Sequence, residues 1–134
     1  MGSMDAPSPG GAASAYSAAF LDHLTHPRRA GRLASPTHRA EVEDGVCGDR
    51  LTLELVVADG VVADAGFRVQ GCPGAIAVGS ALAAALVGRP ARPGAVSSAE
   101  LEAALCGVPP AKRHALRLAT DALAAALRTP VALS

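Results

Sequence analysis

The fold of this chain is decided by residues 51–72, which have the sequence LTLELVVADGVVADAGFRVQGC. In the first part of this stretch, leucine occupies every second position, the period of a strand with one buried face: Leu51, Leu53 and Leu55. Asp59 and Gly60 then supply a hairpin turn, which predicts a returning strand over about residues 61–70. With a shorter strand over residues 39–44, we expect a three-stranded antiparallel meander that offers one face to helices.

Helical patterns lie on both sides of these strands. Ser17 can cap a helix that carries Phe20, Leu21 and Leu24 on an apolar face and ends before Pro27. Pro73 suits a first helical turn, and residues 75–87 form a helix of small and aliphatic residues that is apolar nearly all round. We therefore expect the second of these helices to be central in the fold.

Two further helices are predicted near the C-terminus. Ser97 and Glu100 form a capping box that opens a short helix closing near Cys106 and Gly107. A last helix spans about residues 111–128, after Pro109 and Pro110, with leucines and alanines as its packing stripe. The order of one helix, three strands and three helices indicates an α+β sandwich, not a doubly wound parallel sheet.

Length and composition set limits on the function. With 134 residues the chain amounts to about one domain, and its twelve acidic and twelve basic residues balance, so no nucleic-acid or membrane partner is expected. Residues 1–15 are rich in Pro, Gly, Ser and Ala, and the stretch before Met4 resembles a tag scar. We expect a disordered segment over residues 1–15 and a single domain over residues 16–134.

The cysteines give the first indication of chemistry. Three cysteines at wide spacing, with no cleavable signal sequence and no long apolar span, indicate reduced thiols in the cytoplasm. Cys47 and Cys72 both lie in Gly-flanked turns, which suits metal ligands because a ligand loop must bend tightly around an ion. Cys106 alone is better interpreted as a small core residue.

Other residues can complete a metal site around this pair. Asp49 can add an oxygen ligand, and His114 falls in the first turn of the last helix, where its imidazole could reach the same place. Cys72 begins a helix, whose N-terminus should favour the thiolate. The alternatives are that Asp49 caps a turn and that His114 is a surface residue.

Several short motifs carry a resemblance that covers nearly all of residues 16–127. They are Tyr16-Ser17, Asp22-His23, Pro27-Arg28, Gly31, Cys47-Gly48-Asp49, Phe67, Gly71-Cys72-Pro73 and Val108-Pro109-Pro110-Ala111-Lys112-Arg113-His114. In order and spacing they resemble the U-type iron–sulfur cluster scaffold family, which includes IscU, SufU and the N-terminal domain of NifU. The family's fold, a SufE/NifU-like sandwich with a three-stranded antiparallel sheet packed by helices, agrees with the pattern above.

The resemblance implies a function and a ligand set. It implies a non-enzymatic scaffold or carrier that receives sulfur from a cysteine desulfurase and holds iron or a [2Fe–2S] cluster for transfer to apo-proteins. Carried over by position, the metal ligands are Cys47, Asp49, Cys72 and His114. The third family cysteine would directly follow the histidine, where this chain has Ala115. Either the remaining four residues suffice, or Cys106 substitutes.

Two other functions are also compatible with these residues, and one segment is a candidate surface for binding a partner protein. Two thiolates, an imidazole and a carboxylate would also suit zinc, so a zinc-bound acceptor of persulfide sulfur is one alternative. A degenerate scaffold that regulates a partner is the other. The segment Val108-Pro109-Pro110-Ala111-Lys112 resembles the family's chaperone-recognition segment, but its smaller side chains argue against a chaperone, and it equally suits a rigid loop before the last helix.

Overall fold

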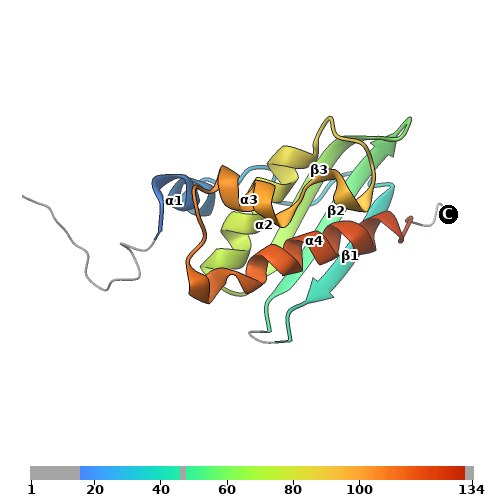
Figure 1. Ribbon diagram of the computed structural model, residues 1–134. Coiled ribbons are helices and arrows are strands. Elements are labelled where there is room, and N and C mark those ends of the chain that lie inside the picture. Colours follow the sequence, from blue (N-terminus) through green and yellow to red (C-terminus); the bar gives the residue numbers. More distant parts are fainter. Residues whose placement is uncertain (1–15, 46–47, 132–134) are drawn as a thin grey trace, which may run out of the picture.

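The computed structural model describes residues 16–45 and 48–131 (Figure 1). Its elements follow the predicted order, with two additional 3-10 turns. They are α1 (Ala18–Thr25), β1 (His38–Glu43), β2 (Arg50–Ala58), β3 (Val61–Gln70), α2 (Pro73–Leu86), a 3-10 turn (Pro93–Ala95), α3 (Ser98–Ala104), a second 3-10 turn (Pro110–Lys112) and α4 (His114–Leu127).

The sheet is the predicted antiparallel meander, with the strand order β1-β2-β3. Leu53 in the middle strand pairs with Ala40 on one side and with Phe67 on the other. Asp59 and Gly60 connect β2 to β3 and both have positive φ, 55° and 75°. A two-residue loop with this geometry matches the twist of the strands, which explains why the Asp-Gly signal located the hairpin correctly.

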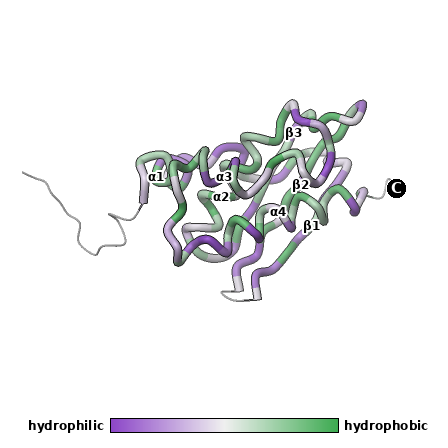
Figure 2. The backbone as a smooth tube through the Cα atoms, in the orientation of Figure 1, coloured by the Kyte–Doolittle hydropathy of each residue, from purple (hydrophilic) through white to green (hydrophobic). Residues whose placement is uncertain are grey.

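The helices cover one face of this sheet, as expected for an α+β sandwich. Helix α2 packs on β3, and α4 runs diagonally over β1 and β2 (Figure 1). The hydrophobic stretches of the chain lie where these helices meet the sheet, whereas the segment just before α4 is hydrophilic (Figure 2). None of the helices formed by the described residues is long and apolar enough to cross a membrane.

Small residues let α2 approach the sheet closely. Most of this helix is buried, as its apolar composition predicted. A Cβ atom placed on Gly79 would lie 2.8 Å from Cδ2 and 3.0 Å from Cε2 of Phe67, which is itself buried on β3. The absence of a side chain at position 79 therefore sets the distance between the central helix and the sheet.

Two predictions about the helices, one for α1 and one for α3, differ from the structure. Leu21 is an exposed residue of α1, whereas Phe20 is buried, because each helical residue is rotated by about 100° from the one before it. Ser17 caps α1 as expected and Ser97 caps α3, each accepting a hydrogen bond from a backbone N–H three residues on. Glu100 does not complete the predicted capping box, because its carboxylate pairs with Arg89.

Short segments pair with the outer strands of the sheet. Residues 29–31 lie beside β3, where the N–H of Gly31 donates to the carbonyl of Phe67 at 2.9 Å. Residues 88–90 pair with the start of the same strand, at Val62. On the other side, residues 129–131 pair with the beginning of β1. Connecting segments thus satisfy backbone groups near both ends of β3 and at the start of β1.

The connector after α1 also covers the face of the sheet opposite the helices. Glu54 of β2 is 3% exposed there, and its Oε1 accepts a hydrogen bond from the backbone N–H of Leu33 at 2.9 Å. Arg39 and Arg68 each bring a guanidinium nitrogen within 3.9 Å of its Oε2. This buried carboxylate is stabilised by two cations and one backbone donor, so it fastens the connector to the sheet.

A buried hydroxyl fixes the start of the same connector. The Oγ of Ser80, on α2, accepts a hydrogen bond from the backbone N–H of Arg28 at 2.8 Å and lies 2.7 Å from Nδ1 of His23. Partial burial lowers the pKa of His23, and the Arg28 guanidinium lowers it further. The neutral imidazole is therefore the form that suits the folded protein.

We predict that Gly79→Ala destabilises the protein by about 1–3 kcal/mol, because the added methyl group overpacks the contact between α2 and Phe67. Urea unfolding followed by circular dichroism measures this change. Gly94→Ala is the matched control, since a Cβ atom there meets nothing within 4 Å. Equal stability of the two variants would contradict the close-packing interpretation.

We also predict that His23 makes the protein less stable in mild acid. A histidine whose pKa is lowered by folding binds its proton more readily in the unfolded chain, so its stabilising contribution is complete above pH 6.5 and is lost as the pH falls from 6.5 through the folded-state pKa. The free energy of unfolding, measured by urea titration between about pH 7.5 and pH 5, should fall less steeply in His23→Gln than in the wild type. Identical pH profiles would refute a role for this imidazole.

Candidate metal centre

Three residues from distant parts of the sequence meet at one end of the sandwich. Asp49 lies just before β2, Cys72 is the N-cap residue of α2, and His114 is the first residue of α4. Their potential ligand atoms, a carboxylate oxygen, the thiol sulfur and an imidazole nitrogen, all lie within 4.8 Å of one another. The structure therefore brings together three of the four residues that the sequence singled out as ligands.

Asp49 holds this group in place. Its side chain is 3% exposed, and its Oδ1 accepts a hydrogen bond from the backbone N–H of Cys72 at 3.0 Å. The thiol of Cys72 donates to Oδ2 of the same carboxylate, with a distance of 3.1 Å between sulfur and oxygen. The carboxylate thus bridges the loop before β2 and the start of α2.

This bridge depends on the glycine that precedes the cysteine. A Cβ atom on Gly71 would lie 2.2 Å from Oδ1 and 2.7 Å from Cγ of Asp49. Gly71 also has φ of +152°, a backbone conformation that side chains disfavour. The prediction that the turn at Cys72 needs glycine is confirmed. Glycine is required there both by the positive φ and because any side chain would collide with the Asp49 carboxylate.

His114 reaches the group from α4. Its Nε2 lies 3.3 Å from Oδ2 of Asp49 and 3.3 Å from Oδ2 of Asp44, which follows β1. The segment before it is held against α2, because a Cβ atom on Gly74 would meet the side chain of Lys112 at 3.0 Å. The 3-10 turn and the start of α4 therefore place the imidazole beside Cys72.

The electrostatics of the group oppose the prediction of a thiolate at Cys72. Burial raises the pKa of the Cys72 thiol, the hydrogen bond to Asp49 raises it further, and the backbone N–H groups of Gly74 and Ala75 only partly offset this. Burial would also raise the pKa of Asp49, but hydrogen bonds from Cys72 and His114 outweigh burial and lower it. The backbone N–H groups at the start of α2 lower the pKa of the thiol, as expected. Burial and the neighbouring carboxylate raise it by more, so the thiol keeps its proton.

The donor set fits a transition-metal ion. Sulfur, imidazole nitrogen and carboxylate oxygen are the ligand types that zinc and iron accept in proteins, and a thiol loses its proton when a metal binds it. Asp49, Cys72 and His114 lie close enough together to bind one ion. They are mostly buried, so an ion among them would interact strongly with the nearby charges.

The remaining predicted residues have different positions. Cys47 lies outside the described residues. Cys106 is exposed, so its interpretation as a core residue is wrong; it has φ of +53°, follows α3 and is not part of the group formed by the other three. Val108 is buried, whereas Pro110 and Ala111 are exposed in the second 3-10 turn.

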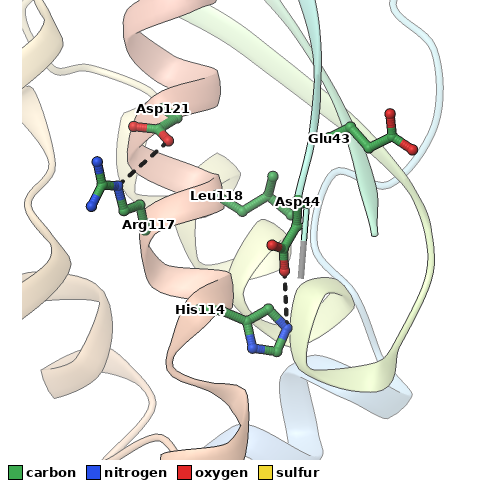
Figure 3. A pocket seen from close by; sticks show the side chains of 7 residues that line it. Glu43, Asp44, His114, Arg117, Leu118 and Asp121 are labelled. Atoms are coloured by element: carbon green, nitrogen blue, oxygen red, sulfur yellow. Dashed lines mark ion pairs between the residues drawn. The ribbon is translucent and has the colours of Figure 1, made fainter. Parts of the chain in front are cut away.

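Asp44, predicted only as the end of a strand, also lies beside the group. Its side chain is 9% exposed and points at His114, and Glu43 points away (Figure 3). Both acids line a pocket of about 240 Å³ between the end of β1 and α4, together with Gly45, His114, Arg117, Leu118 and Asp121. The only sequence signal for this position is an acidic residue at the end of a predicted strand, just before the segment that contains Cys47 and Asp49.

Comparison with known proteins adds a family match. Residues 15–130 match the family described as NifU-like N terminal domain. The Rubrobacter xylanophilus protein named "Bifunctional protein NifU/MnmA" is 36% identical over 81% of this chain, which spans 23% of that longer protein. The Haemophilus influenzae "Iron-sulfur cluster assembly scaffold protein IscU" is 35% identical, with 84% of this chain and 93% of that protein covered.

A solved structure has the same fold. The N-terminal NifU-like protein from Brucella abortus superposes with a TM-score of 0.67 and 26% sequence identity. The match covers 84% of this chain and 91% of the other. The three-stranded sheet and its covering helices are therefore a shared architecture.

We predict that Gly71→Ala removes metal binding at this site, since the new methyl group must displace the Asp49 carboxylate. The loss of a buried, charged hydrogen-bond acceptor should also cost at least about 2 kcal/mol of stability. Zinc affinity, measured by competition with a chromophoric chelator, and urea unfolding report these two effects.

The control is Gly60→Ala. Gly60 also has positive φ, 75°, but a Cβ atom there meets nothing within 4 Å and lies in the distant hairpin turn. This variant should lose about 1–2 kcal/mol through backbone strain and keep the zinc affinity of the wild type. A Gly71→Ala protein that binds zinc normally would show that Asp49 is not positioned as described.

Proposed function

The chain belongs to the family of NifU-like N-terminal domains, and on that premise we propose that it is a scaffold for iron–sulfur cluster assembly. The observation that carries this proposal is the convergence of Asp49, Cys72 and His114 at one end of the fold. The relatives named as cluster assembly scaffolds support it, because the match to them covers most of both chains. Cys47 is proposed as a further ligand on the basis of its sequence position.

Within this proposal the iron and the cluster are cargo. Sulfur would come from a cysteine desulfurase, and apo-proteins would accept the assembled [2Fe–2S] cluster. The chain itself carries out no catalysis and supplies ligands, a partly buried site and a surface for its partners. Free thiols are needed throughout, which suits the reducing cytoplasm.

The mixed donor set suits a site that must release what it binds. A carboxylate and an imidazole bind iron less strongly than thiolates bind it in clusters held by four cysteines. His114 is 19% exposed, so the group is open to solvent on the side of α4. Weaker ligands and an accessible side both favour transfer to an acceptor.

The segment before α4 is the proposed contact for partners. Pro110 and Ala111 are exposed beside the site and are available to another protein. Val108 is buried in the core, which supports the alternative that this end of the segment is a rigid loop leading into α4. Lys112 adds a positive charge near the site, although its stem also packs on Gly74.

A second candidate function is a zinc-bound acceptor of sulfur from a desulfurase. One sulfur, one nitrogen and one oxygen donor within 4.8 Å suit a single tetrahedral ion as well as they suit a cluster. Metal content after purification distinguishes the two functions. Stoichiometric zinc together with stimulation of desulfurase turnover would favour the sulfur acceptor.

We predict that anaerobic reconstitution with ferrous iron, a cysteine desulfurase, free cysteine as the sulfur source and a dithiol that reduces the persulfide sulfur to sulfide produces the visible absorption of an iron–sulfur cluster, and that Cys72→Ala reduces it by at least about tenfold. The reason is that Cys72 supplies the one thiol among the three clustered residues. Ultraviolet–visible and Mössbauer spectra of the desalted protein measure the cluster.

The control for this experiment is Cys106→Ala. Cys106 is exposed and outside the group, so its loss should leave the yield of cluster unchanged. A lower yield in this variant would assign Cys106 a place among the ligands. If the wild type forms no cluster, binds no metal and keeps its affinity for the desulfurase after Cys72→Ala, the scaffold function is wrong and a regulatory binding partner is favoured.

A further inference from the structure

The segment that brings His114 to the candidate metal centre has no buried side chain of its own. Val108 and Ala115 are buried on either side of it, whereas none of residues 109–114, all of which the structure describes, is buried. Backbone hydrogen bonds at its 3-10 turn connect residues three apart, so they fix only its local shape. The place of the imidazole therefore depends on contacts that the side chains of this segment make with other elements.

Two side chains of the segment make such contacts. The stem of Lys112 packs over Gly74 at the start of α2. Arg113, which directly precedes His114, donates hydrogen bonds to both carboxylate oxygens of Glu102 on α3, with Nη2 3.0 Å from Oε1. A bidentate pair of this kind fixes the orientation of its two partners as well as their distance.

The pair between Arg113 and Glu102 holds a helix start that lacks other restraints. Among the described residues, no side chain caps α4 by a hydrogen bond, and its first turn contains no acidic residue. The two side chains are 52% and 33% exposed, and an ion pair this open to water contributes little to stability. Its effect is therefore geometric, because it attaches the residue before His114 to a neighbouring helix.

Helix α3 carries a second ion pair of the same kind, which serves as an internal comparison. Glu100 accepts hydrogen bonds from Arg89 at both carboxylate oxygens, and both side chains are 38% exposed. Positions 100 and 102 are about 200° apart around a helix, so the two pairs leave α3 on different sides. Only the pair made by Glu102 leads to a residue of the candidate metal centre.

Resting on the proposed function, we propose that Arg113, held by Glu102, is a positioning residue of the metal centre. The pair sets the place of the His114 imidazole relative to Asp49 and Cys72, and neither partner touches the metal. Ligands must lie close to their bound geometry for tight binding, so a looser start of α4 weakens binding although every ligand is still present. The pair thus adjusts how firmly the site holds a metal that it must later release.

The first test is zinc affinity, measured by competition with a chromophoric chelator using zinc alone as the probe. Glu102→Gln and Arg113→Gln should each weaken binding by about 3–10-fold, less than the 10–100-fold typical of groups bonded directly to a ligand. The shared direction is decisive. A purely electrostatic effect would make Glu102→Gln bind the cation less tightly and Arg113→Gln bind it more tightly.

The second test asks whether the two residues act as one unit. The double variant Glu102→Gln/Arg113→Gln should bind zinc as weakly as either single variant, because the first substitution already breaks the pair. Glu100→Gln is the matched control, since it breaks the other ion pair of α3 and should keep the zinc affinity of the wild type. Urea unfolding verifies that each variant is folded under the conditions of the zinc measurement.

The outcomes distinguish this inference from the function on which it rests. Weaker binding in both single variants, no further loss in the double variant and an unchanged control support the positioning role. Unchanged affinity in Glu102→Gln, tighter binding in Arg113→Gln, additive losses or an equal loss in Glu100→Gln would each overturn it. In any of these cases, loss of zinc binding in Cys72→Ala would still uphold the metal centre, whereas a wild type that binds no zinc contradicts both proposals.

Discussion

The carboxylate of Asp49 is the interaction on which the functional end of this protein depends. A buried anion must be compensated, and here the compensation comes from the backbone and thiol of Cys72 and from His114. These partners begin α2 and α4, while Asp49 itself precedes β2. One charged group thus aligns the ends of three elements, and Gly71 leaves it the room to do so.

Much of the fold could be predicted from the sequence because its signals are local. The alternating leucines of β2 and the Asp-Gly turn specify the hairpin, and the apolar run after Cys72 specifies a buried central helix. The errors concern choices that depend on tertiary contacts. Leu21 is exposed, whereas the neighbouring Phe20 is buried in the core. The carboxylate of Glu100 forms an ion pair with Arg89 and does not cap the N-terminus of α3.

The candidate site was predictable only in part, for a similar reason. Asp49 and Cys72 stand in turns that need glycine, and the position of His114 after two prolines marks the start of α4, so their residue types and places were informative. Asp44 has only the weaker signal of an acid at a strand end, since its contact with His114 arises when β1 and α4 are brought side by side. The raised pKa of the Cys72 thiol likewise follows from burial and a neighbouring carboxylate, which no sequence pattern near Cys72 reports.

The pairing of short segments with the outer strands has a consequence for how this protein meets others. An open sheet edge is a template for adding a strand from another chain, and that process leads to aggregation. Here β3 is occupied near both ends by connecting segments, β1 is paired at its start, and the exposed remainder of β1 carries Glu41 and Glu43. The paired segments and the acidic side chains at these edges therefore disfavour the addition of a strand from another chain.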